Sequence, residues 1–134
     1  MAKLTLIRGL PGSGKTTLAE ALVEQARRDG RVLHHVETDK LFVGTDGVYR
    51  FRKEWLERFR EHCRTTVWGF MAVDANVVVS ATFVTRAYMQ PYLDMVASWP
   101  GYDVEIITCR GNYENVHGCT PELIRRLRDK WEEL

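Results

Sequence analysis

The sequence has few cysteines, and no two of them stand at the spacing of a metal-binding or redox motif. Cys63, Cys109 and Cys119 are odd in number and widely separated. This arrangement argues against a zinc site or a disulfide framework and favours a reducing compartment. We therefore expect a cytoplasmic protein.

Long apolar runs and a strong net charge are also missing. No stretch approaches the ~18 apolar residues of a membrane-spanning helix, and the N-terminal apolar run is short and broken by Arg8, unlike a signal peptide. The net charge of +1 means that a polyanionic partner would have to meet a local basic patch. With 134 residues, of which 45% are hydrophobic and 28% charged, one globular domain over residues 1–134 is expected.

Apolar patterns predict strands that alternate with helices. Strands are predicted over residues 4–7, 32–37, 76–83 and 102–109, and helices over residues 16–28, 53–74, 86–99 and 121–134. The run "NVVVSATF" is continuous and β-branched, which is typical of a strand buried on both faces of a parallel sheet. The alternation predicts an α/β fold in three layers, with a parallel sheet of about four strands and helices on both faces.

Details of the helix ends follow from turn-forming residues. Gly30 is placed to cap the first helix, and Pro91 indicates a start or a kink in the third helix. Thr120 and Pro121 are typical of an N-cap followed by the first residue of a helix. In the last helix, the predicted apolar face runs from Leu123 to Leu134, and the run "RRLRDKWEE" is expected to be a solvated helix face.

A glycine-rich loop, "GLPGSGKT", follows the first predicted strand at residues 9–16. It matches the P-loop pattern G-x-x-x-x-G-K-[ST], in which glycines let consecutive backbone N–H groups face one anion. The N-terminus of the following helix adds partial positive charge. Lys15 would meet the β- and γ-phosphates, and the Thr16 hydroxyl would bind Mg²⁺. ATP and Mg²⁺ are therefore the expected cofactors, held by Gly9, Pro11, Gly12, Ser13, Gly14, Lys15, Thr16 and Thr17.

Asp39 lies at the end of the second predicted strand, in "ETDKLF". Ligands of open α/β sheets bind beyond the carboxyl ends of the strands, where an aspartate can accept the proton of an attacking hydroxyl. Asp39 could equally cap a following helix, and its position leaves both roles open. The third strand ends "VVVSATF", without the acid that many P-loop proteins carry there. Mg²⁺ would then rest on Thr16, the phosphates, water and Asp39.

Several cations follow the predicted strands and could stabilise a phosphoryl-transfer transition state. Arg86 follows the third strand and Arg110 the fourth, and we expect both to be catalytic. Arg50, Phe51, Arg52 and Thr82 are candidate contacts of the acceptor, since basic and aromatic side chains together suit nucleic acid. Taken singly, each arginine is more often a solvated surface charge. Asn115 and His117 are candidate nucleotide contacts, although a lone histidine is more often a packed or capping residue.

The sequence resembles the P-loop kinases of the polynucleotide-kinase type. These include the kinase half of phage 5′-polynucleotide kinase and the related small AAA-domain and zeta-toxin-like ATP-binding proteins. The resemblance covers nearly the whole chain. It rests on "LIRGLPGSGKTTLA", "ETDKLFVGTDGVYRF", "VVVSATFVTRAYMQPYL" and "NVHGCTPELIRRLRDKWE".

The resemblance implies a role for each matching position. Asp39 falls on the general base that faces the acceptor hydroxyl, and Lys15 and Thr16 fall on the phosphate lysine and the Mg²⁺ ligand. His117 lies near the position of a lid arginine, for which Arg110 or Arg125 could substitute.

The implied activity is an ATP-dependent kinase acting on a hydroxyl of nucleic acid. The acceptor would be a 5′-OH end or, as in small phage kinases, 5-hydroxymethyluracil in DNA, which would place a phage protein in the host cytoplasm. Two alternatives stay open: a kinase of nucleosides or other small molecules, and a non-catalytic ATP-binding regulatory module. A GTPase switch is disfavoured because the N-K-x-D pattern is missing.

Overall fold

The structure is a computed structural model that describes residues 2–111 and 121–134, with Asp39 and Lys40 described by their backbone alone. Strands and helices alternate along the chain, as the sequence predicts. The elements in chain order are β1 (Ala2–Arg8), α1 (Lys15–Arg28), β2 (Leu33–Glu37), the 3-10 helix η1 (Thr38–Phe42), α2 (Lys53–Ala72), β3 (Asn76–Ala81), α3 (Arg86–Ala97), β4 (Tyr102–Thr108) and α4 (Pro121–Lys130).

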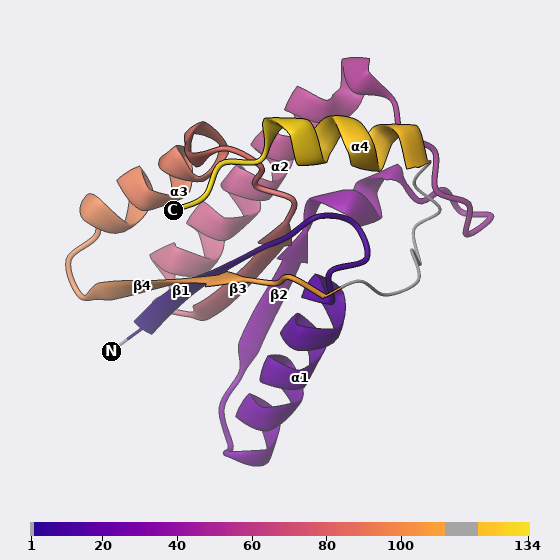
Figure 1. The fold of residues 1–134 in the computed structure, drawn as a ribbon. Coiled ribbons are helices and arrows are strands. Elements are labelled where there is room, and N and C mark those ends of the chain that lie inside the picture. Colours follow the sequence, from indigo (N-terminus) through magenta and orange to yellow (C-terminus); the bar gives the residue numbers. More distant parts are fainter. Residues whose placement is uncertain (1, 112–120) are drawn as a thin grey trace.

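The four strands form one parallel sheet in the order β2-β3-β1-β4. Helix α1 covers one face of the sheet, and α2 and α3 cover the other (Figure 1). The predicted three-layer α/β fold is thereby confirmed. Among the described helices, none is both long and apolar enough to cross a lipid bilayer.

The core lies on both faces of the two central strands. On the side of α2 and α3, Leu4, Leu6, Val77 and Val79 are fully buried, and on the side of α1, Ile7 and Val78 are fully buried. Successive residues of a strand point to opposite faces, so a strand buried on both sides needs apolar residues at every position. This explains why β3 is a continuous apolar run.

The end of the last helix differs from the prediction. Helix α4 ends at Lys130, and Trp131 and its neighbours leave the helix instead of extending its apolar face to residue 134. The backbone N–H of Glu132 donates to the carbonyl oxygen of Val84 at 2.7 Å, which holds the segment after α4 against the loop between β3 and α3. The predicted cap of the first helix is confirmed, because Gly30, with φ of +75°, follows the end of α1. Pro91 lies inside α3 rather than at its start.

Candidate active site

The loop between β1 and α1 has the backbone shape of a phosphate cradle. Gly12 and Gly14 have φ of +81° and +96°, in the left-handed region that favours glycine. Gly9 is needed for space, because a Cβ there would lie 2.1 Å from Ser13 Oγ and 2.9 Å from the carbonyl oxygen of Cys109. The predicted glycine positions therefore carry the conformation that the sequence motif requires.

Two polar side chains of this loop are buried and have few hydrogen-bond partners among the described residues. Lys15 and Ser13 are each 5% exposed. Lys15 Nζ lies 3.4 Å from the carbonyl oxygen of Leu10, and Ser13 Oγ has no hydrogen-bond partner among the described residues. Buried polar groups are normally hydrogen-bonded, and a triphosphate would supply the missing acceptors. These residues therefore fit the phosphates of ATP.

Thr16 is held by an acid that the sequence analysis did not single out. Thr16 Oγ1 donates to Glu37 Oε1 at 2.5 Å, and Glu37 is 6% exposed. Glu37 is the last residue of β2 and pairs in register with Ser80 of β3, where the sequence lacks an acid. The acid beside Thr16 thus comes from the next strand along the sheet, and its signal was its place at the carboxyl end of a predicted strand.

Around this pair the site has few candidate metal ligands. No group of three or more His, Cys, Asp or Glu side chains gathers within the described part of the chain. Thr16 with Glu37 nearby fits a Mg²⁺ ion that takes most of its oxygens from phosphates and water. Asp39 is the second residue of η1, directly beyond β2, so the backbone reaches the expected edge of the sheet while the side chain lies outside the described part.

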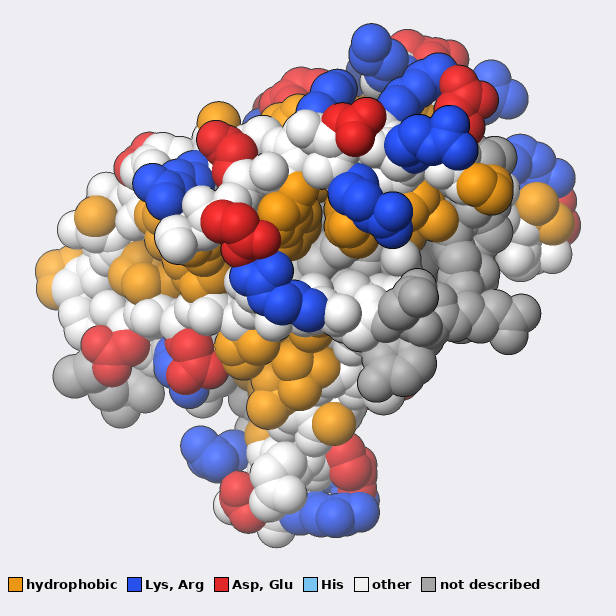
Figure 2. All heavy atoms as spheres, viewed as in Figure 1, with side chains coloured by type: hydrophobic (Ala, Val, Ile, Leu, Met, Phe, Trp, Pro, Cys, Tyr) orange, Lys and Arg blue, Asp and Glu red, His pale blue; other side chains and the backbone are white. Residues whose placement is uncertain are grey.

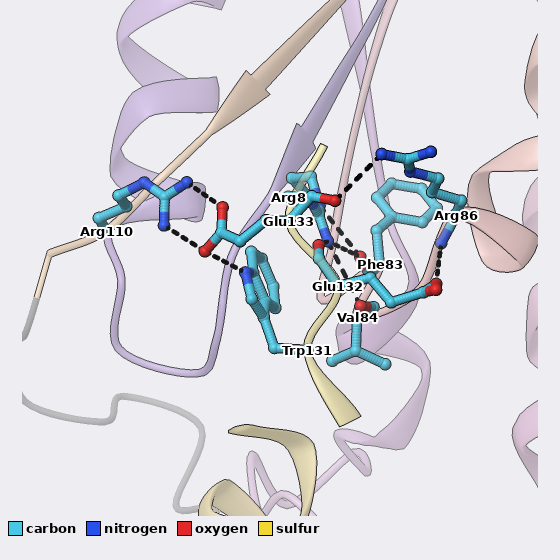
Figure 3. Close-up of polar contacts among 8 residues, drawn as sticks. All are labelled: Arg8, Phe83, Val84, Arg86, Arg110, Trp131, Glu132 and Glu133. Atoms are coloured by element: carbon cyan, nitrogen blue, oxygen red, sulfur yellow. Dashed lines mark hydrogen bonds and ion pairs between the residues drawn. The ribbon is translucent and has the colours of Figure 1, made fainter. Parts of the chain in front are cut away.

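The two expected catalytic cations both contact the segment after α4 (Figure 3). Arg110 forms two hydrogen bonds to the Glu133 carboxylate, at 2.9 Å and 2.5 Å, which lower the pKa of Glu133 to about 2. The Arg86 guanidinium donates to the backbone carbonyl of Glu133 at 3.2 Å, and the Arg86 backbone N–H donates to Glu132 Oε1 at 2.8 Å. Their catalytic role stays a prediction.

Two cavities flank the carboxyl edge of the sheet. The nucleotide-side cavity, of about 880 Å³, lies between the P-loop, the end of β4 and α4, and includes Leu10, Pro11, Ser13, Arg110, Arg125, Arg128, Trp131 and Glu133. The α2–α3 cavity, of about 340 Å³, is lined among others by Thr38, Arg60, Arg64, Thr82, Phe83 and Tyr88. Thr82 is thus the one expected acceptor contact that lines a described cavity.

The other expected acceptor contacts lie on the connection from η1 to α2 and line neither cavity. Arg50 pairs with Asp46 at 2.6 Å, Phe51 packs against Phe42, and the Arg52 guanidinium lies over the Trp55 ring. Thr17 is exposed on α1. Asn115, His117 and the predicted N-cap Thr120 lie outside the described residues.

Helix α4 brings basic side chains to the nucleotide-side cavity. Figure 2 shows Lys and Arg side chains gathered over α4, with acidic side chains between them. Helix α4 carries Arg125, Arg126, Arg128 and Lys130, and two of these four, Arg125 and Arg128, line the cavity. This cavity is therefore suited to an anionic ligand.

Comparison with known proteins places this geometry in a family. A family model described as an AAA domain, AAA_33, matches residues 4–116. A mutant of the Mycobacterium tuberculosis APS kinase CysC has a similar fold, with a TM-score of 0.66, 18% identity and 96% of each chain covered. Chaetomium thermophilum Kti12, solved in complex with ADP-AlF3, has a TM-score of 0.73 and 15% identity, with 97% of this chain and 80% of that chain covered.

A third solved structure, of the Pnkp1/Rnl/Hen1 complex, has a TM-score of 0.61 and 21% identity. The match covers 79% of this chain and 35% of that chain, so this chain corresponds to about a third of it. At these identities the likeness concerns the fold, which is that of the P-loop kinases.

Proposed function

The chain belongs to the AAA domain family AAA_33, and from this membership and its kinase neighbours we propose that it is an ATP-dependent kinase. Residues 1–134 act as a single P-loop kinase domain that transfers the γ-phosphoryl group to a hydroxyl of nucleic acid. The acceptor is the 5-hydroxymethyl group of a modified pyrimidine in DNA or a 5′-OH end. The observation that carries the proposal is the pair of cavities at one sheet edge, one at the P-loop and one beside Thr38.

The P-loop is the donor side. Backbone N–H groups at the start of α1, those of Gly14, Lys15 and Thr16, and the Lys15 ammonium hold the phosphates, and Thr16 binds Mg²⁺, which neutralises phosphate charge when it is present. Glu37 orients the Thr16 hydroxyl through the 2.5 Å hydrogen bond. Arg110, Arg125 and Arg128 line the same cavity and supply further positive charge.

The α2–α3 cavity is the acceptor side. Thr38 lines it, and the proposed general base, Asp39, is the next residue in the chain. Arg60 lies with its guanidinium 3.9 Å from the centroid of the Tyr88 ring, and both side chains line the cavity. An arginine beside an aromatic ring suits a base and its backbone phosphate. A cavity of about 340 Å³ is of the size that takes a single nucleoside unit.

The reaction moves one phosphoryl group and one proton. The acceptor oxygen forms a bond to the γ-phosphorus while the bond from that phosphorus to the β,γ-bridging oxygen breaks, and ADP leaves. The hydroxyl proton passes to the Asp39 carboxylate. Lys15 and the arginines of the nucleotide-side cavity stabilise the charge on the transferred group.

The decisive experiment incubates the protein with γ-labelled ATP, Mg²⁺ and a panel of acceptors. The panel contains 5′-OH oligonucleotides, DNA with hydroxymethylated pyrimidines and free nucleosides. We expect label on nucleic acid, and a loss of at least ~10²-fold in transfer for Asp39→Asn with AMPPNP affinity nearly unchanged. Normal transfer by Asp39→Asn would contradict the assignment of the base.

Substitutions of three arginines on α2 test whether the acceptor binds in the α2–α3 cavity. Arg60→Ala and Arg64→Ala remove cations from the cavity lining and should raise the KM for the nucleic-acid acceptor by about tenfold each, which corresponds to about 1.4 kcal/mol of binding. Arg58 is exposed on the same helix, outside that lining, and Arg58→Ala is the matched control. Equal effects of all three substitutions would contradict the placement of the acceptor.

A second candidate is a kinase of nucleosides or other small molecules. The α2–α3 cavity is compatible with it, because a volume of about 340 Å³ would hold a free nucleoside and a single nucleotide of a strand equally well. Label that appears on free nucleosides alone would establish this alternative and overturn the nucleic-acid acceptor.

A further inference from the structure

Arg8 is a fully buried charge directly before the first glycine of the P-loop, and the proposed reaction gives it no role. It is 0% exposed. Its guanidinium donates to the carbonyl oxygens of Phe83, at 3.1 Å and 2.9 Å, of Val84 at 3.3 Å and of Glu132 at 2.7 Å. The ring of Trp131 covers it at 3.9 Å. Burying a charge is costly unless it is well satisfied, so this arrangement calls for an explanation.

The partners of Arg8 come from two distant parts of the chain, 75 and 124 positions away. One is the loop between β3 and α3, and the other is the segment 131–133 (Figure 3). A single planar guanidinium therefore joins β1 and the P-loop to both. An aliphatic residue would fill this volume without the desolvation cost, but it would not join the three segments.

The loop that Arg8 holds has a strained backbone. Phe83 has φ of +42°, in the left-handed region that a bulky residue adopts only under strain. Its carbonyl oxygen receives two of the Arg8 hydrogen bonds. The neighbouring Thr82 carbonyl oxygen receives the N–H of Gly9 at 3.3 Å, so the P-loop and this loop are also joined directly.

These segments form walls of the two cavities. Thr82 and Phe83 line the α2–α3 cavity, whereas Trp131 and Glu133 line the nucleotide-side cavity. Arg8 contacts Phe83 from one wall and Trp131 from the other. Arg8 therefore connects the segment 131–133 to the loop that lines the α2–α3 cavity.

We propose that Arg8 is a positioning residue that couples the nucleotide-side cavity to the α2–α3 cavity. A nucleotide that contacts Trp131 and Glu133 orders the segment 131–133, and Arg8 transmits this order to the Thr82–Val84 backbone. The acceptor wall then reaches its working shape when the donor is bound. The inference rests on the proposed function in assigning donor and acceptor to the two cavities.

The test is hydrogen exchange of the full chain with and without AMPPNP and Mg²⁺. In the wild-type protein, AMPPNP should slow exchange at residues 82–85 several-fold. Arg8→Lys keeps the charge but lacks the planar fork that reaches several carbonyls. For this variant we expect the slowing to fall below twofold, while the AMPPNP Kd stays within about threefold of the wild-type value because no contact to the nucleotide is lost. Arg27→Lys, at an exposed arginine on α1, is the control and should keep the full response.

A second variant covers the case in which Arg8→Lys does not fold. Trp131→Leu leaves the hydrogen-bonding groups of Arg8 unchanged and removes the ring that covers it, and it should also lose the response at residues 82–85. With an active acceptor, the folded Arg8 variant should lose about tenfold or more in kcat with little change in the KM for ATP, as expected for a misplaced reacting group. A stability loss with unchanged kcat per folded molecule would show a purely structural role.

The outcomes separate this inference from the proposed function. A wild-type protein that binds AMPPNP without slower exchange at residues 82–85 overturns the coupling and leaves the kinase assignment intact. Variants that keep the full response also overturn it. A clear response in a protein that phosphorylates none of the acceptors supports the coupling and overturns the proposed transfer to nucleic acid, whereas a protein that does not bind AMPPNP overturns both.

Discussion

Gly9→Ala tests whether the first glycine of the P-loop is required for space. The new Cβ would lie 2.1 Å from Ser13 Oγ, 3.0 Å from Ser13 Cβ and 2.9 Å from the Cys109 carbonyl oxygen. The hydroxyl of Ser13 can rotate away, but the other two atoms belong to a buried Cβ and to backbone. The loop itself must therefore shift.

The magnitude follows from overpacking in a closely packed region. Such a substitution costs about 1–3 kcal/mol, which for a domain of this size lowers Tm by roughly 3–10 °C. Part of the cost falls on the phosphate cradle, since the N–H of Gly9 is also bonded to the Thr82 carbonyl. Because 1.4 kcal/mol is a factor of ten in affinity, we expect the AMPPNP Kd to rise by about tenfold or more.

The assay is calorimetric titration with AMPPNP and Mg²⁺, together with thermal unfolding. Gly69→Ala is the matched control: Gly69 lies in α2, with no atom within 4 Å of a built Cβ. Alanine in a helix interior should raise stability by about 0.5–1 kcal/mol and leave the Kd unchanged. If Gly9→Ala behaves like Gly69→Ala in both measurements, the steric reasoning is refuted.

Three further predictions concern groups around the site. Glu37→Gln keeps a hydrogen bond to Thr16 but loses the charge, so AMPPNP affinity should fall about tenfold with Mg²⁺ and hardly at all in EDTA; equal losses in both titrations would argue against a role toward the metal. Arg110 holds the pKa of Glu133 at about 2, below the ordinary 4.5, so the stabilisation is present above pH 4.5 and lost as pH falls toward 2. The Tm difference between wild type and Glu133→Gln should shrink over that window and stay constant above it. Burial raises the pKa of the Cys109 thiol, so labelling by iodoacetamide at pH 8, measured by peptide mass spectrometry, should be slow. AMPPNP should slow this labelling further, because Cys109 lines the nucleotide-side cavity. Rapid labelling at the same rate with and without AMPPNP would count against the assignment of the nucleotide to this cavity.

The fold was predictable because the apolar pattern within each strand and helix indicates which of its faces are buried. The run Val77–Val79 has apolar residues on both faces of a strand, and α1 has an apolar stripe after a glycine-rich turn, so a parallel sheet with helices on both faces is the consistent solution. The P-loop was predictable for the same reason, since its glycines, lysine and threonine are adjacent in sequence.

The rest of the site depends on strand order and on distant contacts. Glu37 reaches Thr16 because β2 lies beside β3 in the sheet, and no local pattern gives that order. The helical spacing of Trp131 and Leu134 predicted a longer last helix. The helix ends at Lys130 instead, and Trp131 packs against Arg8. Arg8 was the available signal, because a charge at the end of a buried strand requires partners.

The position of Arg8 also has a consequence for how the protein forms. Strand β1, which leads into the P-loop, pairs in register with β3 and β4, which follow it in the chain, and the Arg8 hydrogen bond to Glu132 spans 124 positions. Contacts of such long range form slowly, since the chain must close large loops first. We expect nascent chains that end before residue 131 to bind nucleotide poorly on the ribosome, and the phosphate cradle to mature as one of the last events of folding.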